Sequence, residues 1–280
     1  MRHPGRAPGR TRHSPGPAGA LRRTALTSLF DLTGHVALVT GGNSGIGLGM
    51  AHGLAQSGAD VCIWGTNAER NEAAARELSK HGTRVRAIRC DVGDEDAVTA
   101  AFARTVEHFG RVDSCFANAG VNGSGTPFVD TGIETFRKIT RVNLEGAFLT
   151  LRAASRHMVE RGGGGVLVGT SSVSTIHAAP RNQAYAASKS GLTAMIKGCA
   201  VELARYGITA HSIVAGWTET PLIASERSNP AFERNVMKRM PLRRWGTPED
   251  FARLAVYLAG GVGGFHTGDE IVVDGAYSIF

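Results

Sequence analysis

The sequence predicts a single-domain α/β protein in which one doubly wound parallel sheet carries helices on both faces. Short apolar runs alternate with stretches of helical period along most of the chain, and this alternation is typical of a covered parallel sheet. The first apolar run is followed by a glycine-rich turn and then by a helical pattern. Neither an internal repeat nor a second domain is evident in the sequence.

The elements follow one another in a regular order. Short apolar runs predict buried strands at His35–Thr40, Asp60–Trp64, Arg84–Arg89, Val112–Ala117, Val166–Thr170, Thr209–Val214 and Ile271–Val273. Helical periodicity predicts one helix that ends near Gln56 and others at Asn67–His81, Glu95–Phe109, Ile133–Arg161, Asn182–Arg205 and Pro248–Ala259. The polar segment Thr218–Arg244 has no clear period, so we expect an irregular, mobile lid.

The glycine turn joins the first strand to the first helix. Gly41, Gly45 and Gly47 follow the spacing Gly-x3-Gly-x-Gly, which differs from the common dinucleotide fingerprint. Glycines let a backbone approach a phosphate, and a helix N-terminus supplies N–H groups and positive potential. We therefore expect a Rossmann-type phosphate cradle, and a plain tight turn is the structural alternative.

The net charge of +7 comes from the N-terminal segment. Residues 1–30 hold six arginines and no acid, so the rest of the chain carries 25 basic and 24 acidic residues. We expect residues 1–28, rich in Arg, Pro and Gly, to be a disordered basic tail, and residues 29–280 to form the folded domain. Arginine-rich arms can bind phosphate, but a solvated leader is favoured over a nucleic-acid partner.

Cysteine usage and hydropathy indicate a cytoplasmic protein without a membrane span. No apolar run approaches the roughly 18 residues of a membrane helix. Small buried side chains in a reducing compartment are expected for Cys62, Cys90, Cys115 and Cys199. We predict no metal site, because no second ligand is suitably spaced for binding with His157, His177 or His266.

Tyr185 and Lys189 lie four residues apart within the predicted helix Asn182–Arg205, so both side chains face one side. A tyrosine ordinarily has a pKa of about 10. A cation beside it favours the phenolate, so we expect Lys189 to lower the pKa of Tyr185. An amphipathic helix that carries both residues by chance is the alternative. The pair gains weight from Ser172, Asn143 and the glycine turn.

Together these residues resemble the classical short-chain dehydrogenases/reductases, from about Leu29 to the C-terminus. The motifs that carry the resemblance are Thr40–Gly47, Asp91-Val92, Asn118-Ala119-Gly120 and the tetrad Asn143, Ser172, Tyr185 and Lys189. The resemblance implies cofactor contacts from Thr40, Gly41, Asn43, Ser44, Gly45, Ile46, Gly47, Thr66, Asp91, Val92, Asn118, Ala119, Gly120, Tyr185, Lys189, Gly216, Thr218 and Thr220.

The resemblance also implies a role for each member of the tetrad. Tyr185 would be the acid in carbonyl reduction and the base in alcohol oxidation, while Lys189 would hold the nicotinamide ribose. Ser172 would hydrogen-bond the substrate oxygen and stabilise charge as hydride arrives. Asn143 would hold a water that links Lys189 to solvent.

The chain departs from the family pattern at four places. Ala117 stands where a second Asn usually precedes the Asn-Ala-Gly motif, and Thr218 stands where Ile or Val is commoner. His211 and Ala215 replace the usual Asn and Pro near the sixth strand. Loss of the proline frees a backbone angle, so we expect a looser loop and weaker nicotinamide binding.

Cofactor choice is expected to depend on Gly65, Thr66 and Asn67, after the second strand. A carboxylate there would bond the ribose and repel a 2′-phosphate, but none is present. The basic residue common in NADP enzymes, in place of Thr66 or Ser44, is absent too. We expect a moderate preference for NADP(H) over NAD(H), aided by Thr66 and Arg70, and we expect Gly65→Asp to reverse it.

The resulting prediction is an oxidoreductase (EC 1.1.1.-) that interconverts a ketone or aldehyde and an alcohol by NAD(P)(H)-dependent hydride transfer. A catalytically silent dinucleotide sensor or scaffold of the same fold is the alternative. Substrate specificity should reside in Thr218–Arg244 and Val121–Phe128. We also expect a homotetramer or dimer, paired through apolar faces of the Ile133–Arg161 and Asn182–Arg205 helices.

Overall fold

The computed structural model describes residues 30–261 and 264–280 of the chain. Its centre is a sheet of seven parallel strands in the spatial order β3-β2-β1-β4-β5-β6-β7. The strands are β1 (Val36–Thr40), β2 (Asp60–Gly65), β3 (Val85–Arg89), β4 (Ser114–Ala117), β5 (Gly165–Ser172), β6 (Ile208–Ala215) and β7 (Glu270–Val273). The predicted strands and fold class are confirmed.

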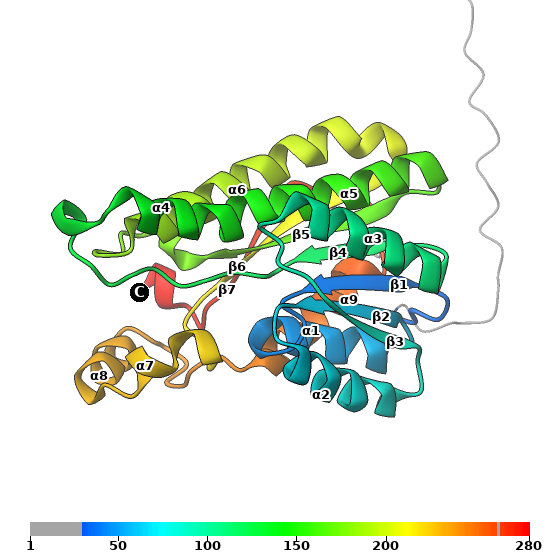
Figure 1. The fold of residues 1–280 in the computed structure, drawn as a ribbon. Helices are drawn as coiled ribbons and strands as arrows, with labels where there is room; N and C mark the ends of the chain where they lie inside the picture. The colour runs from blue at the N-terminus through cyan, green and yellow to red at the C-terminus, as the bar shows by residue number, and fades with distance from the viewer. Residues whose placement is uncertain (1–29, 262–263) are drawn as a thin grey trace, which may run out of the picture.

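Helices cover both faces of this sheet (Figure 1). One face carries α1 (Gly45–Gln56), α2 (Ala68–Leu78) and α9 (Ala252–Ala259), and the other carries α3 (Glu95–Phe109), α5 (Gly146–Arg161) and α6 (Gln183–Leu203). Neighbouring strand residues point to opposite faces, so Leu38 and Val39 of β1 lie in two different apolar cores. Strands covered on both sides must therefore be apolar throughout, which explains their continuous runs.

The chain order reverses beside β1, which lies between β2 and β4. Loops that follow these strands turn away from each other and leave a crevice at the carboxyl ends of the strands. This is where the sequence places the glycine turn and Asn118.

The predicted helix Ile133–Arg161 is interrupted. A π-helical turn, Arg141–Glu145, separates α4 (Ile133–Thr140) from α5, and Asn143 lies in this turn. Such turns often occur at functional sites. The helices predicted at Asn67–His81 and Asn182–Arg205 end in short 3₁₀ turns instead of continuing as α-helix. Pro248 likewise opens a 3₁₀ turn that leads into α9.

The prediction of an irregular Thr218–Arg244 segment is wrong, because the segment contains α7 (Ala224–Arg227) and α8 (Pro230–Lys238). The side chain of Asn229 accepts hydrogen bonds from two N–H groups at the start of α8, and Pro230 occupies the first helical position. The segment packs with the C-terminal end through a third apolar cluster, made of Ile223, Val236, Met240, Trp245 and Tyr277. Its mobility stays a prediction.

The predicted tail, residues 1–28, lies outside the described residues. The cysteines are free, with Cys62, Cys90 and Cys115 buried and Cys199 partly buried. Across the described ranges, no helix combines the length and apolar character that a membrane crossing requires.

Candidate functional site

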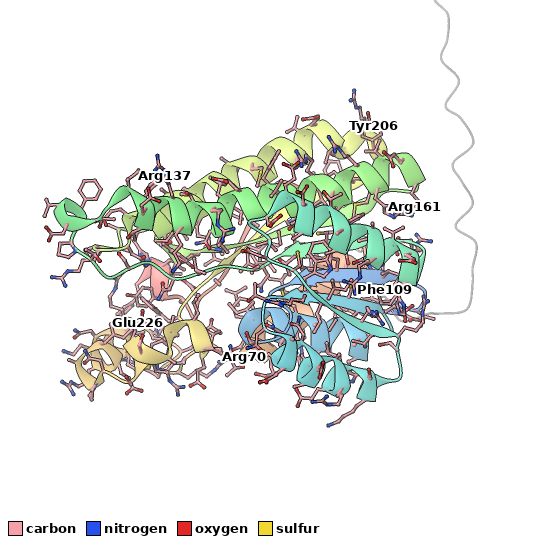
Figure 2. All side chains as sticks on the ribbon, in the orientation of Figure 1. Arg70, Phe109, Arg137, Arg161, Tyr206 and Glu226 are labelled. Atoms are coloured by element: carbon pink, nitrogen blue, oxygen red, sulfur yellow. The ribbon has the colours of Figure 1, made fainter. Side chains whose placement is uncertain are left out.

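A cavity of about 1030 Å³ opens at the carboxyl ends of the strands. Its volume lies at the upper end of the usual range for ligand sites, about 300–1,000 Å³, so it can hold a dinucleotide and a small substrate. Figure 2 labels two of its lining residues, Arg70 on α2 and Glu226 on α7. Most of the predicted site residues line this cavity, whereas Thr40, Gly47 and Asn143 lie behind its wall.

The glycine turn is shaped for close backbone approach. Gly41 and Gly45 have φ values of 63° and 52°, which side-chain-bearing residues rarely adopt. A Cβ on Gly47 would lie 2.3 Å from the carbonyl oxygen of Gly41, so the turn packs directly on α1. Ser44 precedes α1 and makes no side-chain cap bond. The first N–H groups of α1 are therefore available to an anion.

Thr40 and Asn118 tie β1 to the loop after β4. The Thr40 hydroxyl accepts hydrogen bonds from the backbone N–H groups of Asn118 and Ala119, each at 3.0 Å. The Asn118 amide donates to the Thr40 carbonyl at 3.0 Å. Through these hydrogen bonds Thr40 holds the cradle in shape. Its side chain is buried and does not line the cavity.

Tyr185 and Lys189 project from the first turns of α6 toward Ser172 at the end of β5. The Lys189 Nζ lies 5.6 Å from the centre of the Tyr185 ring and donates to the Thr170 carbonyl at 2.8 Å. Lys189 is buried, and the Ser172 hydroxyl is hydrogen-bonded to Tyr185. The structure thus brings three members of the tetrad together at one wall of the cavity.

Burial shifts the pKa values of both titrating groups. It raises the pKa of Tyr185, and the hydrogen bond with Ser172 opposes this rise only in part. Burial also lowers the pKa of Lys189 to about 8. The predicted net lowering of the Tyr185 pKa is wrong for this arrangement, because desolvation of the phenol outweighs the interactions that favour the phenolate.

Asn143 anchors the segment that follows the Asn-Ala-Gly motif. Its Oδ1 accepts from the Val121 N–H at 2.8 Å, and its Nδ2 donates to the Val121 carbonyl at 3.0 Å and to the Ser188 hydroxyl at 3.2 Å. A Cβ on Gly120 would lie 3.5 Å from the Lys189 Nζ. The buried Asn143 side chain therefore positions this backbone beside Lys189.

Gly65 has no space for a side chain. A Cβ there would lie 2.3 Å from the Asn43 amide nitrogen and 2.6 Å from the Asn71 amide oxygen. Asn71 cannot move away easily, because it is buried and donates to the carbonyls of Gly65 and Ile88. Gly65→Asp would therefore displace both amide side chains and disturb the end of β2, and the expected reversal of cofactor preference stays a prediction.

Thr66 is instead the exposed position at this end of the cavity. Arg70 also lines the cavity, and the Arg89 Nε donates to the Thr66 carbonyl at 3.2 Å. Neither arginine has an acidic partner within the described ranges. Sequence reasoning missed Arg89, although the parallel register that pairs the ends of β2 and β3 places it beside Gly65.

Asp91 lies at the same end of the cavity, with both carboxylate oxygens engaged. Its Oδ1 accepts from the Gly93 N–H at 3.0 Å, and its Oδ2 pairs with Arg141 at 3.1 Å. Val92 lies beside it on the cavity wall. These bonds fix the loop after β3 at the edge of the predicted adenine pocket.

The loop after β6 is held on both sides of Thr218. The Gly216 N–H donates to Val273 at 2.9 Å, and the Glu219 N–H donates to Gly246 at 2.8 Å. A Cβ on Gly45 would lie 3.0 Å from the Thr220 methyl group, so the loop also touches the glycine turn. These contacts hold the loop at three points, and the looser loop expected from Ala215 stays a prediction.

The opposite end of the cavity combines aromatic and cationic side chains. The His177 and Tyr277 rings lie 5.2 Å apart, and the Arg239 guanidinium lies 4.6 Å from the centre of the Tyr277 ring. The Asn122 amide donates to Glu226 at 2.7 Å, which links the Val121–Phe128 and Thr218–Arg244 segments. Both segments predicted to set specificity therefore line this end.

Several buried polar atoms at the cavity wall have no hydrogen-bond partner within the described part of the chain. They are Thr170 Oγ1, Ser174 Oγ, His177 Nε2, Asn182 Oδ1 and Trp217 Nε1. Buried polar groups are normally paired, so these atoms indicate a site that a polar ligand completes. Together with the glycine turn, they fit a bound dinucleotide and an oxygen-bearing substrate.

The histidines are arranged differently from the sequence expectation. His157 accepts a hydrogen bond from the Val112 N–H, and His177 packs against Tyr277. His266, however, lies beside His211 and Asp269. The statement that it lacks nearby ligand partners is therefore wrong, because the fold joins residues that are far apart in sequence.

Comparisons with known proteins agree with this geometry. A family model described as Enoyl-(Acyl carrier protein) reductase matches residues 41–278. The 2-(R)-hydroxypropyl-CoM dehydrogenase of Xanthobacter autotrophicus is 36% identical, over 87% of this chain and 98% of the relative.

Two solved structures are similarly close. A short-chain type dehydrogenase/reductase from Mycobacterium marinum has a TM-score of 0.85 at 34% identity, over 89% of this chain and 97% of that one. A gluconate 5-dehydrogenase from Burkholderia cenocepacia, solved with NADP and tartrate, has a TM-score of 0.85 at 33% identity, over 90% and 98%.

Proposed function

The chain is an oxidoreductase of the classical short-chain dehydrogenase/reductase family, and we propose that it interconverts a carbonyl and an alcohol with Tyr185 as the acid–base group. The observation that carries this proposal is the convergence of Ser172, Tyr185 and Lys189 on one cavity wall beside the glycine turn. An intact, convergent site favours turnover over a silent dinucleotide sensor.

Each side chain has a defined task in this proposal. The bound nicotinamide supplies or accepts the hydride. A tyrosine ordinarily keeps its proton at neutral pH, and burial raises the pKa of Tyr185 further, so Tyr185 carries a proton that it can donate to the carbonyl oxygen during reduction. The Ser172 hydroxyl donates to the same oxygen and stabilises its developing charge. Lys189 would contact the nicotinamide ribose, and Asn143 holds the neighbouring backbone.

The preferred cofactor in this proposal is NADP(H). Thr66, Arg70 and Arg89 offer a hydroxyl and two guanidinium groups at the end of β2, where a 2′-phosphate would lie. Charge-assisted bonds to phosphate are stronger than neutral ones. The exposure of all three side chains makes the preference moderate.

We extend the proposal to alcohols and carbonyls that carry a negatively charged group. Arg181 and Arg239 line the substrate end, and neither has an acidic partner in the described part of the chain. Glu226, an acid on the cavity lining, is hydrogen-bonded to Asn122. A substrate carboxylate would therefore meet excess positive charge there, and the similar gluconate dehydrogenase structure contains tartrate.

Replacement of Tyr185 by Phe tests the reaction assignment. We expect turnover to fall by about 10²–10⁴-fold, while cofactor binding measured by nicotinamide fluorescence stays within about twofold. Tyr206→Phe, at a partly exposed tyrosine after α6, is the matched control. Turnover of Tyr185→Phe within a few-fold of the unaltered protein contradicts the assignment.

Paired substrates test the charge preference separately. A cyclic alcohol with a carboxylate should have a kcat/KM at least about tenfold above its methyl ester, since one charge-assisted contact is worth about 1.5–3 kcal/mol. Arg239→Gln should remove this advantage but leave turnover of the ester. Arg234→Gln, on α8 and outside the cavity lining, should keep it. If the unaltered protein has the same kcat/KM for the carboxylate and its methyl ester, the preference for charged substrates is refuted, but the reaction assignment is not.

We also propose a homo-oligomer, a tetramer or a dimer. Apolar side chains are exposed on the helices that flank the site: Ile133 and Phe136 on α4, Phe148 on α5 and Val201 on α6. Exposed apolar groups gathered on one side of a molecule often mark a subunit interface. Light scattering at micromolar concentration checks this, and Phe148→Arg should lower the mass if α5 pairs.

A further inference from the structure

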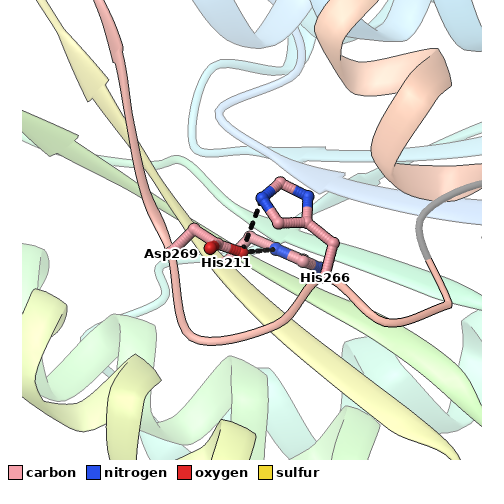
Figure 3. Close-up of side chains that lie close together, drawn as sticks. All are labelled: His211, His266 and Asp269. Carbon is pink, nitrogen blue, oxygen red and sulfur yellow. Dashed lines mark hydrogen bonds and ion pairs between the residues drawn. The ribbon is translucent and has the colours of Figure 1, made fainter.

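Three potential ligand groups meet at the edge of the sheet, away from the cavity (Figure 3). His211 lies on β6, whereas His266 and Asp269 come from the loop that enters β7. Asp269 Oδ2 lies 3.2 Å from His211 Nδ1 and 2.9 Å from His266 Nε2. The three ligand atoms all lie within 4.8 Å of one another.

The backbone around this cluster is rigidly tied. The Gly268 N–H donates to Ala210 at 2.7 Å, and the Ser212 N–H donates to Asp269 at 2.9 Å. The Ala210 N–H donates to the Thr267 hydroxyl at 3.0 Å. These bonds flank His211 on both sides, so the two segments present their ligand atoms with little remaining freedom.

Two of the three separations are close to those between the ligand atoms of a coordinated metal ion. Zinc holds nitrogen and oxygen ligands at about 2.0–2.2 Å, which places tetrahedral neighbours about 3.4 Å apart. The two short separations here, 3.2 and 2.9 Å, differ from this by a few tenths of an ångström. A small outward movement of Asp269 would admit the ion.

The charges around Asp269 also favour a cation. Its ion-pair partners in the described part of the chain are the two imidazoles, and no Lys or Arg pairs with it there. Lys197 pairs with the neighbouring Glu270 instead. A divalent cation would supply the missing positive charge.

The cluster has an outer partner and an open side. The Tyr257 hydroxyl lies 3.4 Å from His266 Nδ1, so it can orient the ring with Nε2 toward Asp269. The His211 side chain is buried, but those of His266 and Asp269 are 36% and 32% exposed. An ion can therefore enter from solvent and complete its coordination with water.

We propose that His211, His266 and Asp269 form a binding site for one divalent transition-metal ion. Two imidazoles and one carboxylate suit zinc, cobalt or nickel, whereas calcium and magnesium prefer oxygen ligands. The site is separate from the catalytic cavity and does not enter the proposed reaction. It would join the end of the chain to β6 across the edge of the sheet.

Titration of the untagged full-length protein tests the site. After treatment with EDTA, zinc chloride should bind with one equivalent at this site in calorimetry and should raise Tm. Cobalt chloride should give the visible absorption bands of nitrogen- and oxygen-ligated cobalt. Magnesium chloride should give neither response.

Variants assign the ligands. His211→Asn and His266→Gln should weaken zinc binding by at least about 100-fold, and Tyr257→Phe by about 10-fold. His52→Gln removes a histidine of α1 that contacts His81 outside this cluster, and it should leave affinity unchanged. Melting curves recorded without metal show whether each variant folds. If His211→Asn does not fold, His266→Gln, which lies in a loop, still tests the site.

Two results would overturn the site. One is no zinc binding by the unaltered protein at millimolar concentration. The other is zinc binding that persists when His211 and His266 are each replaced. That result would mean that the ion binds elsewhere, for example to His3 and His13.

Discussion

Replacing Thr66 by Asp should move the cofactor preference from NADP(H) toward NAD(H). The position is exposed at the end of β2, between Arg70 on α2 and Arg89 at the end of β3. A carboxylate there would accept hydrogen bonds from an unmodified ribose and would repel a 2′-phosphate. It would also form ion pairs with the two arginines and so reduce their attraction for phosphate.

The size of the change can be worked from these contacts. Two unit charges about 4 Å apart interact by about 1 kcal/mol in water and about 4 kcal/mol near a protein surface. The exposure of Thr66 favours the lower half of this range, and one weakened charge-assisted bond adds up to about 1.5 kcal/mol. A total of about 2–3 kcal/mol corresponds to a change of about 30- to 150-fold in the kcat/KM ratio of the two cofactors.

Steady-state kinetics with one alcohol and both oxidised cofactors measure this ratio. Thr66→Val is the matched control, because it removes the hydroxyl without adding charge and should change the ratio by less than about fivefold. Gly65→Asp should instead lower Tm, since its Cβ would overlap Asn43 and Asn71. The reasoning is refuted if Thr66→Asp changes the ratio by less than threefold, or no more than Thr66→Val does.

Three further outcomes are expected. As the pH rises from about 7.5 to 9.5, the unfolding free energy of the cofactor-free protein should increase by about 2 kcal/mol relative to that of Lys189→Met. The reason is that the folded state releases the Lys189 proton at a pKa of about 8, whereas the unfolded state keeps it up to the ordinary lysine pKa. Urea unfolding at both pH values measures this, and a parallel pH response in the two proteins contradicts it. Gly47→Ala should lower Tm and abolish cofactor binding, because its Cβ would lie 2.3 Å from the Gly41 carbonyl oxygen. Gly198→Ala in α6 is the control: its Cβ would meet no atom within 4 Å, so it should stabilise the protein by up to about 1 kcal/mol. Asn143→Ala should lower the free energy of unfolding in urea by about 1–3 kcal/mol and reduce kcat, because the Val121 N–H and carbonyl lose their buried partner. Unchanged stability would show that these two backbone groups find another hydrogen-bond partner.

Local sequence determined the strands, most helices and the glycine turn. A strand covered on both faces must be apolar at every position, so β1, β2 and β5 could be recognised from short runs alone. The order of Tyr185 and Lys189 on one helix face follows from helical period, and the turn before α1 follows from its glycines. The pattern that signals each of these features lies in residues that are close together in the chain, so it can be recognised without knowledge of the fold.

Tertiary structure decided how those pieces act together. Whether position 65 or 66 can carry a side chain depends on Asn43 and Asn71, which reach Gly65 from the glycine turn and from α2, respectively. The direction of the Tyr185 pKa depends on burial, which no local pattern reports. The cluster of His211, His266 and Asp269 exists because β6 and β7 pair across more than fifty residues of sequence. Packing alone brings such groups within bonding distance, so local period and spacing could not predict them.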